Sequence, residues 1–181
     1  MIMPPKILAE GDLFLIRPEE DDAEELCDSI LSSEADLRKY MVWLKADYGV
    51  DDALTWIREV VDRWDEAHNW AYLIRSPREP VALGCVDIHL IDKQNLTGCL
   101  GYWMRSDQAG KGVAPRAARA LAAAAFQFGG LRRIELIIAA DNLRSQMVAV
   151  KLGAEREAVL KNRIRTPAGQ TDGVVYALFP E

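Results

Sequence analysis

The sequence predicts a single α+β domain, residues 1–181, built on a mixed, mostly antiparallel sheet of seven strands flanked by helices. Three strand-like segments joined by short turns, at residues 70–75, 81–91 and 96–105, predict an antiparallel meander. The third segment leads through a glycine loop and an alanine-rich helix into a strand at residues 133–140. This strand–helix–strand order predicts a central parallel pair of strands, because such crossovers connect parallel neighbours.

The composition is that of an ordinary globular chain. Hydrophobic residues make up 50% of the 181 positions, charged residues make up 28%, and the net charge is −6 at pH 7. This negative balance argues against a nucleic-acid partner, whose binding requires clustered basic side chains. The three cysteines show no CxxC spacing, so we expect reduced thiols and a cytoplasmic protein. The absence of a long apolar segment or a secretion signal predicts no membrane association.

The N-terminal part predicts one strand and three helices. Residues 13–17 predict the strand, and Pro18 precedes an acidic turn of the kind that starts a helix. Apolar spacing predicts the helices, of which the third is capped by an aspartate. The apolar positions are Leu26, Ile30 and Leu31 in the first helix, Leu37, Tyr40, Met41 and Leu44 in the second, and Leu54, Ile57, Val61 and Trp64 in the third, which begins at Asp51 or Asp52.

The C-terminal part predicts one helix and a final hairpin. Asn142 is a suitable N-cap, and Gly153 is a suitable terminator for the helix between them. Residues 156–165 and 171–179 predict the last two strands, which are joined through Pro167-Ala168-Gly169.

The loop Gly110-Lys111-Gly112 has the chemistry of an anion site. Its glycines let backbone N–H groups approach a ligand, and the start of the following helix adds unpaired N–H groups and a positive dipole end. Pro115 fits that first turn, where its missing N–H is not needed. Arg105, in place of a first glycine, excludes a Walker loop, and Pro115 excludes a Rossmann fingerprint. A tight turn without a ligand is the alternative interpretation.

The segments around this loop resemble the GCN5-related N-acetyltransferase (GNAT) superfamily, specifically its ribosomal-protein N-terminal acetyltransferase (RimJ/RimL-type) branch. The resemblance covers nearly the whole chain and rests on GYWM at residues 101–104, the loop at residues 107–112, the alanine-rich helix and NLRS at residues 142–145. In that family the loop pattern R/Q-x-x-G-x-G/A binds the pyrophosphate of acetyl-coenzyme A. Asp107 departs from this pattern, and Gln108, one place later, is the nearest substitute.

The resemblance implies acetyl-CoA as co-substrate and no metal. It implies that the strands at residues 96–105 and 133–140 splay apart, with the pantetheine arm in the gap beside a bulge at residues 102–105. The cofactor-binding residues that it implies are Trp103, Met104, Arg105, Gln108, Ala109, Gly110, Lys111, Gly112, Val113, Ala114 and Asn142.

Ser145 and His89 are the predicted catalytic residues. Ser145 matches the N-x-x-S form of the branch, which implies donation to the leaving sulfur, whereas the tyrosine of many relatives is replaced by Ala149. An ordinary helix serine bonded to a carbonyl one turn back is the alternative. His89 shares a strand face with Asp87 and titrates in the range that a general base needs. The alternatives to His89 are Tyr176, Glu135, Asp141 or a chain of waters.

The implied reaction is acetyl transfer to a primary amine, with a protein N-terminal α-amine as first choice. A small amine (antibiotic, amino acid or polyamine) and a non-catalytic acyl-CoA-binding module are the alternatives. In this branch the first helices and the last hairpin wall the acceptor site, so residues 40–44 are expected there. Helix packing is the simpler interpretation of Trp43, Tyr48 and Trp56, with at least one as a candidate for the pocket; the acidic Asp47, Asp51 and Asp52 are either an attraction for a cationic acceptor or plain surface. Many relatives are dimers, so a homodimer remains open.

Overall fold

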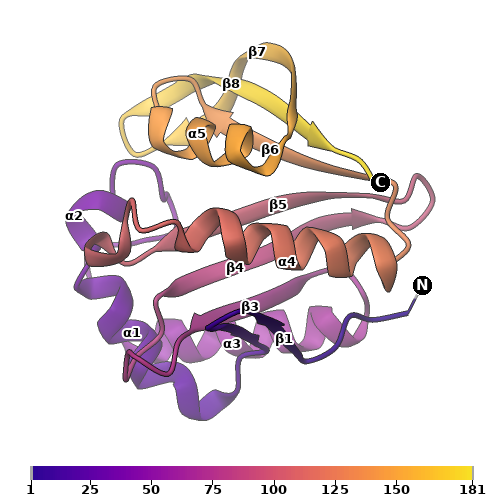
Figure 1. The fold of residues 1–181 in the computed structure, drawn as a ribbon. Coiled ribbons are helices and arrows are strands. Elements are labelled where there is room, and N and C mark those ends of the chain that lie inside the picture. Colours follow the sequence, from indigo (N-terminus) through magenta and orange to yellow (C-terminus); the bar gives the residue numbers. More distant parts are fainter. Residues whose placement is uncertain (1, 181) are drawn as a thin grey trace.

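The computed structural model describes residues 2–180 and confirms an α+β fold on one sheet (Figure 1). The strand order is β1-β2-β3-β4-β5-β6-β8-β7, and β5 with β6 is the parallel pair. The structure adds β1 to the seven predicted strands. The strands are β1 Ile7–Glu10, β2 Leu13–Ile16, β3 Trp70–Arg75, β4 Gly84–Asp92, β5 Thr97–Met104, β6 Arg133–Ala139, β7 Glu155–Thr166 and β8 Gly169–Leu178.

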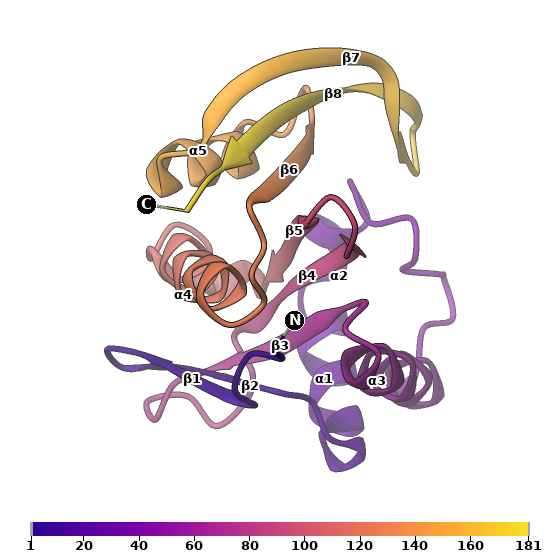
Figure 2. The ribbon, with the colours of Figure 1, turned by 90° about the vertical axis from the view of Figure 1, so that its right-hand side faces the viewer.

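Helices cover both faces of the sheet (Figure 2). α4 and α5 lie on one face, and α1 and α3 lie on the other. No helix within residues 2–180 is both long and apolar enough to cross a membrane. The helices are α1 Ala23–Leu31, α2 Glu34–Leu37, α3 Val50–Asp65, α4 Val113–Gln127 and α5 Leu143–Leu152, with short 3₁₀ turns η1 Glu20–Asp22 and η2 Ser106–Gln108.

The sequence of α4 lets this helix pack closely on the sheet. Ala117, Ala118 and Ala125 are fully buried, and Leu121 lies among them in the core cluster that includes Val86 of β4. Alanine combines the highest helix propensity with the smallest buried side chain, so the helix axis can approach the strands. This packing fixes the N-terminus of α4 close to the end of β5.

Two predictions in the N-terminal part are wrong in detail. The second helix ends at Leu37, and the chain then turns because the Arg38 guanidinium donates to the carbonyls of Leu44 (3.1 Å) and Lys45 (2.8 Å). α3 is capped at Gly49, two residues before Asp51 and three before Asp52, the predicted caps. Asp52 still contributes, since its carboxylate accepts from the Gly49 N–H at 3.0 Å. As a result, Tyr40 to Trp43 form a loop over the sheet and not a helix.

The ends of α5 follow the prediction. Asn142 is the N-cap, and its side chain accepts from the N–H of Ser145. Gly153 ends the helix with φ +80°, while Ala154 donates to the carbonyl of Ala149 at 3.1 Å. A left-handed glycine with such a bond is a common helix terminator. The cap holds Ser145 in the first turn of the helix.

The parallel pair splays apart as predicted. β5 and β6 pair over three residues each, ending at Cys99 and Glu135. Beyond these residues each strand stays paired on its other side, β5 with β4 and β6 with β8. The backbone N–H and C=O groups that face the gap therefore have no strand partner, and a buried row of such groups favours an extended ligand.

The predicted bulge at residues 102–105 is not found. The pairing of β5 with β4 runs in unbroken register from Cys99 to Met104. The register shift lies in β4 instead, between His89 and Asp92. Divergence of β6, and not a bulge in β5, is what frees the backbone groups of the gap.

Candidate active site

The gap between β5 and β6 opens into a cleft with two parts. The loop cavity, about 710 Å³, lies between the loop before α4, the start of α5 and residues 36–41. The α3 cavity, about 690 Å³, lies between the gap, residues 40–48 and α3. The two cavities form one cleft because six residues border both of them: Tyr40, Met41, Tyr102, Trp103, Asn142 and Ser145.

The loop cavity contains a cradle of unpaired backbone donors. Gly110 and Gly112 both have φ +79°, a left-handed conformation that favours glycine, although an added Cβ would meet no atom within 4 Å. Within residues 2–180, no oxygen accepts from the backbone N–H groups of Gly110, Gly112, Val113 or Ala114. Four free N–H groups at the positive end of a helix can bind a phosphate or pyrophosphate.

The charged residues of the loop bind one another. Arg105 is 2.7 Å from Asp107 and 3.8 Å from Glu79, and it borders neither cavity. Lys111 also lies outside both linings, and its Nζ donates to Gln108 Oε1 at 3.3 Å. These contacts hold the loop in shape, so the charged side chains of the loop leave its backbone N–H groups as the donors that it offers to the cavity. The other predicted cofactor-binding residues all border the loop cavity: Trp103, Met104, Gln108, Ala109, Gly110, Gly112, Val113, Ala114 and Asn142.

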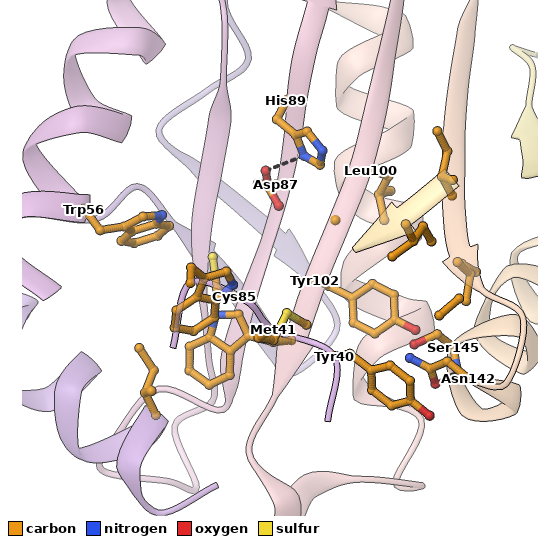
Figure 3. Close-up of a pocket in the computed structure, with 18 of the residues that line it drawn as sticks. Tyr40, Met41, Trp56, Cys85, Asp87, His89, Leu100, Tyr102, Asn142 and Ser145 are labelled. Atoms are coloured by element: carbon orange, nitrogen blue, oxygen red, sulfur yellow. Dashed lines mark hydrogen bonds and ion pairs between the residues drawn. The ribbon is translucent and has the colours of Figure 1, made fainter. Parts of the chain in front are cut away.

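Ser145 presents a free hydroxyl to the cleft. In the part of the chain that the structure describes, its Oγ makes no hydrogen bond, so it does not bond a carbonyl one turn back. Asn142 Oδ1 accepts from the Ser145 N–H at 3.2 Å and fixes its position. The nearby Tyr102 hydroxyl is buried and has no hydrogen-bond partner among residues 2–180 (Figure 3). The side chain of Tyr102 is not among the predicted site residues, although strand alternation indicates the face to which it points.

Asp87 and His89 form a pair in the α3 cavity. His89 Nδ1 lies 2.8 Å from Asp87 Oδ2 (Figure 3). Gly101 faces Asp87 across the strands, and a Cβ there would lie 2.7 Å from Asp87 Oδ1 and 3.1 Å from His89 Cε1. The pair therefore keeps this geometry with glycine at position 101, a dependence that the sequence pattern does not reveal.

The charge of Asp87 controls the titration of His89. Burial lowers the pKa of His89, but the hydrogen bond and the charge of Asp87 together outweigh burial and raise it above the ordinary 6.5. Because Nδ1 is held by the carboxylate, Nε2 is the nitrogen left to accept a proton. This arrangement has the chemistry of a general base.

The alternative bases lie elsewhere. Tyr176 donates to Gln146 at 3.3 Å, Glu135 accepts from Arg133 at 2.8 Å, and neither Tyr176 nor Glu135 borders the cleft. Asp141 borders the loop cavity but not the α3 cavity. His89 stays the predicted base.

The candidate base and the candidate acid lie on opposite faces of the sheet. Cys85 and Trp103 pack with the helices α1 and α3, and Asp87 follows Cys85 on that face by alternation. Tyr102 packs on the α4 side, where α5 carries Ser145. The β5–β6 gap connects the two faces, so a bond located in the gap is accessible from both sides.

Aromatic side chains line the α3 cavity. Trp43, Tyr48 and Trp56 all border it, and the Trp43 and Tyr48 rings are 5.9 Å apart. Of the three aspartates considered in the sequence analysis, Asp52 alone is part of the lining, and Lys45 lies 2.9 Å from it. The cavity therefore combines an apolar wall with a few charged groups, as ligand sites usually do.

These parts define an acyltransferase that draws its acyl group from a nucleotide-linked carrier. The cradle fits a pyrophosphate, the gap fits an extended arm, and acid and base candidates lie on either side of the gap. The chain belongs to the GNAT acetyltransferase family, since the model of the Acetyltransferase (GNAT) domain matches residues 12–155. The predicted family and enzyme class, an N-acetyltransferase with acetyl-CoA as donor, are thereby confirmed.

Individual relatives agree with this assignment. The chain is 24% identical over 163 residues to YdaF of Bacillus subtilis (strain 168), named as a candidate ribosomal N-acetyltransferase, covering 89% of this chain and 87% of YdaF. The fold of the present chain matches that of RimL, a ribosomal L7/L12 α-N-protein acetyltransferase solved with coenzyme A (TM-score 0.90, 21% identity, covering 96% of this chain and 97% of RimL). It also matches the microcin C7 self-immunity acetyltransferase MccE, solved with acetyl-CoA and AMP (TM-score 0.87, 23% identity, 94% and 93%).

Gly112→Ala should raise the KM for acetyl-CoA about tenfold, because a Cβ in the left-handed region costs about 1–2 kcal/mol and disturbs the cradle. Initial rates at varied acetyl-CoA give this KM, and kcat should change little. Gly130→Ala is the matched control, since Gly130 has φ +70° at the far end of α4 with no atom within 4 Å of an added Cβ. Equal KM values for acetyl-CoA in the two variants would contradict the proposal that the N–H groups of the loop bind acetyl-CoA.

Proposed function

We propose that the acceptor is the α-amine at a protein N-terminus. The carrying observation is the Asp87–His89 pair in the α3 cavity, across the gap from Ser145. An α-amine has a pKa near 8, so a base whose pKa is raised above 6.5 can accept its proton, whereas a lysine ammonium near 10.4 is a harder donor. The names of YdaF and RimL, which refer to ribosomal proteins, support the same acceptor.

Each part of the cleft has one task in this reaction. Acetyl-CoA supplies an acetyl group activated as a thioester. The free N–H groups of the loop bind the pyrophosphate, and the unpaired backbone groups of β5 beyond Cys99 align the arm and offer donors to the acetyl oxygen. His89 removes the proton from the amine as the new C–N bond forms. Ser145 donates a hydrogen bond to the sulfur, which keeps the electron pair of the breaking C–S bond and leaves as a thiolate.

Ser145→Ala should lower kcat about tenfold while the Kd for coenzyme A changes less than twofold, because the hydroxyl acts on the leaving sulfur and not on the nucleotide. Steady-state rates and calorimetric titration measure the two quantities. Ser145→Thr keeps a hydroxyl at this position and should retain most of the rate. An unchanged kcat in Ser145→Ala would rule out this role.

A panel of amines tests the acceptor. Thiol release from acetyl-CoA is followed with peptides that have a free α-amine, with the same peptides blocked at the N-terminus but carrying lysine, and with small amines. We expect turnover on the free α-amines. Turnover on blocked peptides, or on small amines alone, would overturn the proposal.

A small aromatic amine is the second candidate, and the aromatic wall of the α3 cavity favours it. Trp43 is 44% exposed, which is a large exposure for a tryptophan and leaves its ring open to a ligand. The same panel decides between the candidates when it includes aromatic amines that lack a peptide bond. A cytoplasmic location is part of the proposal, since Cys27, Cys85 and Cys99 are free thiols.

A further inference from the structure

The Tyr102 hydroxyl is buried in the cleft, and residues 2–180 provide no hydrogen-bond partner for it. Most buried hydroxyls in proteins are paired, because an unpaired one loses its hydrogen bonds to water without replacement. The ring packs on the core cluster beneath α4, so the hydroxyl cannot turn away to solvent without unpacking the ring. Packing explains the position of the ring but leaves the hydroxyl without a function.

Tyr102 lies where the two cavities meet. It borders both of them and belongs to β5 beyond Cys99, where β6 has already diverged. Its side chain extends toward the start of α5, beside Ser145 (Figure 3). Burial raises the pKa of Tyr102 and the neighbouring Ser145 hydroxyl partly offsets this rise, although the two groups are outside hydrogen-bond geometry.

The hydroxyls of Ser145 and Tyr102 both lack a hydrogen-bond acceptor among the described residues, and both are directed at the junction of the cavities. The phenol is protonated at neutral pH, since the ordinary pKa of a tyrosine is near 10 and burial raises that of Tyr102, so it can donate a hydrogen bond. Two donors fixed beside each other are complementary to an atom on which negative charge develops.

We infer that Tyr102 is a second hydrogen-bond donor, beside Ser145, to the sulfur of coenzyme A. This role rests on the proposed function of Ser145 and is independent of the acceptor. When the C–S bond breaks, its electron pair remains on the sulfur, and the phenol stabilises that charge without losing its own proton. Hydrogen bonds to an ionised acceptor are the strong ones, so the effect on a thiolate exceeds the effect on a thioester.

The test measures the pKa of the thiol of bound coenzyme A, from the ultraviolet absorbance of its thiolate as pH is varied, with no amine present. In the wild-type complex this pKa should lie below that of free coenzyme A in the same buffer. Tyr102→Phe should raise the bound-thiol pKa by about one unit. Tyr48→Phe is the control, because it removes a hydroxyl from the α3 cavity alone and should leave this pKa unchanged.

Two results would overturn the inference. One is a bound-thiol pKa in Tyr102→Phe equal to that of the wild type. The other is a wild-type value equal to that of free coenzyme A, which requires no variant and so holds even where Tyr102→Phe does not fold. Because the titration contains no acceptor, failure of the α-amine proposal leaves its outcome unchanged, and the two failures can be told apart.

Discussion

His89→Gln should lower kcat by about 10²–10³-fold, the usual contribution of a general base, with little change in the KM for acetyl-CoA. Glutamine keeps a polar side chain of similar length but cannot accept the proton of the amine. Since His89 borders the α3 cavity and not the loop cavity, acetyl-CoA binding should be preserved. Initial rates at varied acetyl-CoA measure both constants, and a kcat within threefold of the wild type would reject His89 as the base.

The pH profile gives an independent check of the same residue. The neutral imidazole is the active form, so activity should be full at high pH and fall as pH decreases through a pKa above 6.5. Asp87→Asn removes the cause that raises this pKa and leaves burial, which lowers it. The acid limb of kcat/KM should therefore move to lower pH in Asp87→Asn. A limb that stays in place would show that another group controls the profile.

Gly101→Ala should lower kcat by about 10²-fold, because the added Cβ would lie 2.7 Å from Asp87 Oδ1 and forces the carboxylate to move. A shift of about 1 Å in a catalytic group is enough for such a loss. The acid limb of kcat/KM should also move to lower pH in this variant, as in Asp87→Asn, because the 2.8 Å contact between Asp87 and His89 is broken. Rates and pH profiles measure both effects.

Gly49→Ala controls for the loss of a glycine itself. An added Cβ at Gly49 would meet no atom within 4 Å, so the helix α3 should tolerate it. Thermal unfolding of both variants separates a local displacement from general instability. A Gly101→Ala enzyme with normal kcat would mean that the Asp87–His89 pair does not require its present geometry.

Much of the fold follows from local signals. The caps Asn142 and Gly153 determine α5 by their own hydrogen bonds and backbone angles, so the sequence predicts both ends. The sequence does not predict β1, because this edge strand has four residues and its alternation of apolar and polar side chains is too short to be distinctive. The second helix was predicted too long because apolar spacing continues to Leu44, whereas contacts of Arg38 with later carbonyls turn the chain.

In the candidate site too, features set by local sequence could be predicted, and features set by tertiary contacts could not. The glycine loop was predictable because its backbone angles and its helix start are local properties. The roles of Gly101 and Tyr102 depend on which residues β4 and β5 place opposite one another, and register is not visible in one sequence. The ion pair of Arg105 with Asp107 could not be predicted either, because a sequence shows where charged residues occur but not which of them pair in the fold.

The short contact between β5 and β6 has a thermodynamic consequence. Three residue pairs connect the two halves of the sheet directly, and packing in the shared core adds to the free energy that holds β6, β7 and β8 on the rest of the fold. A ligand that binds both walls of the gap in the folded state, and neither in the unfolded one, adds to the free energy of unfolding. At a concentration of 100 times its Kd this gain is about 2.7 kcal/mol. The enzyme's resistance to heat and to proteolysis is thus coupled to the concentration of its own acyl donor.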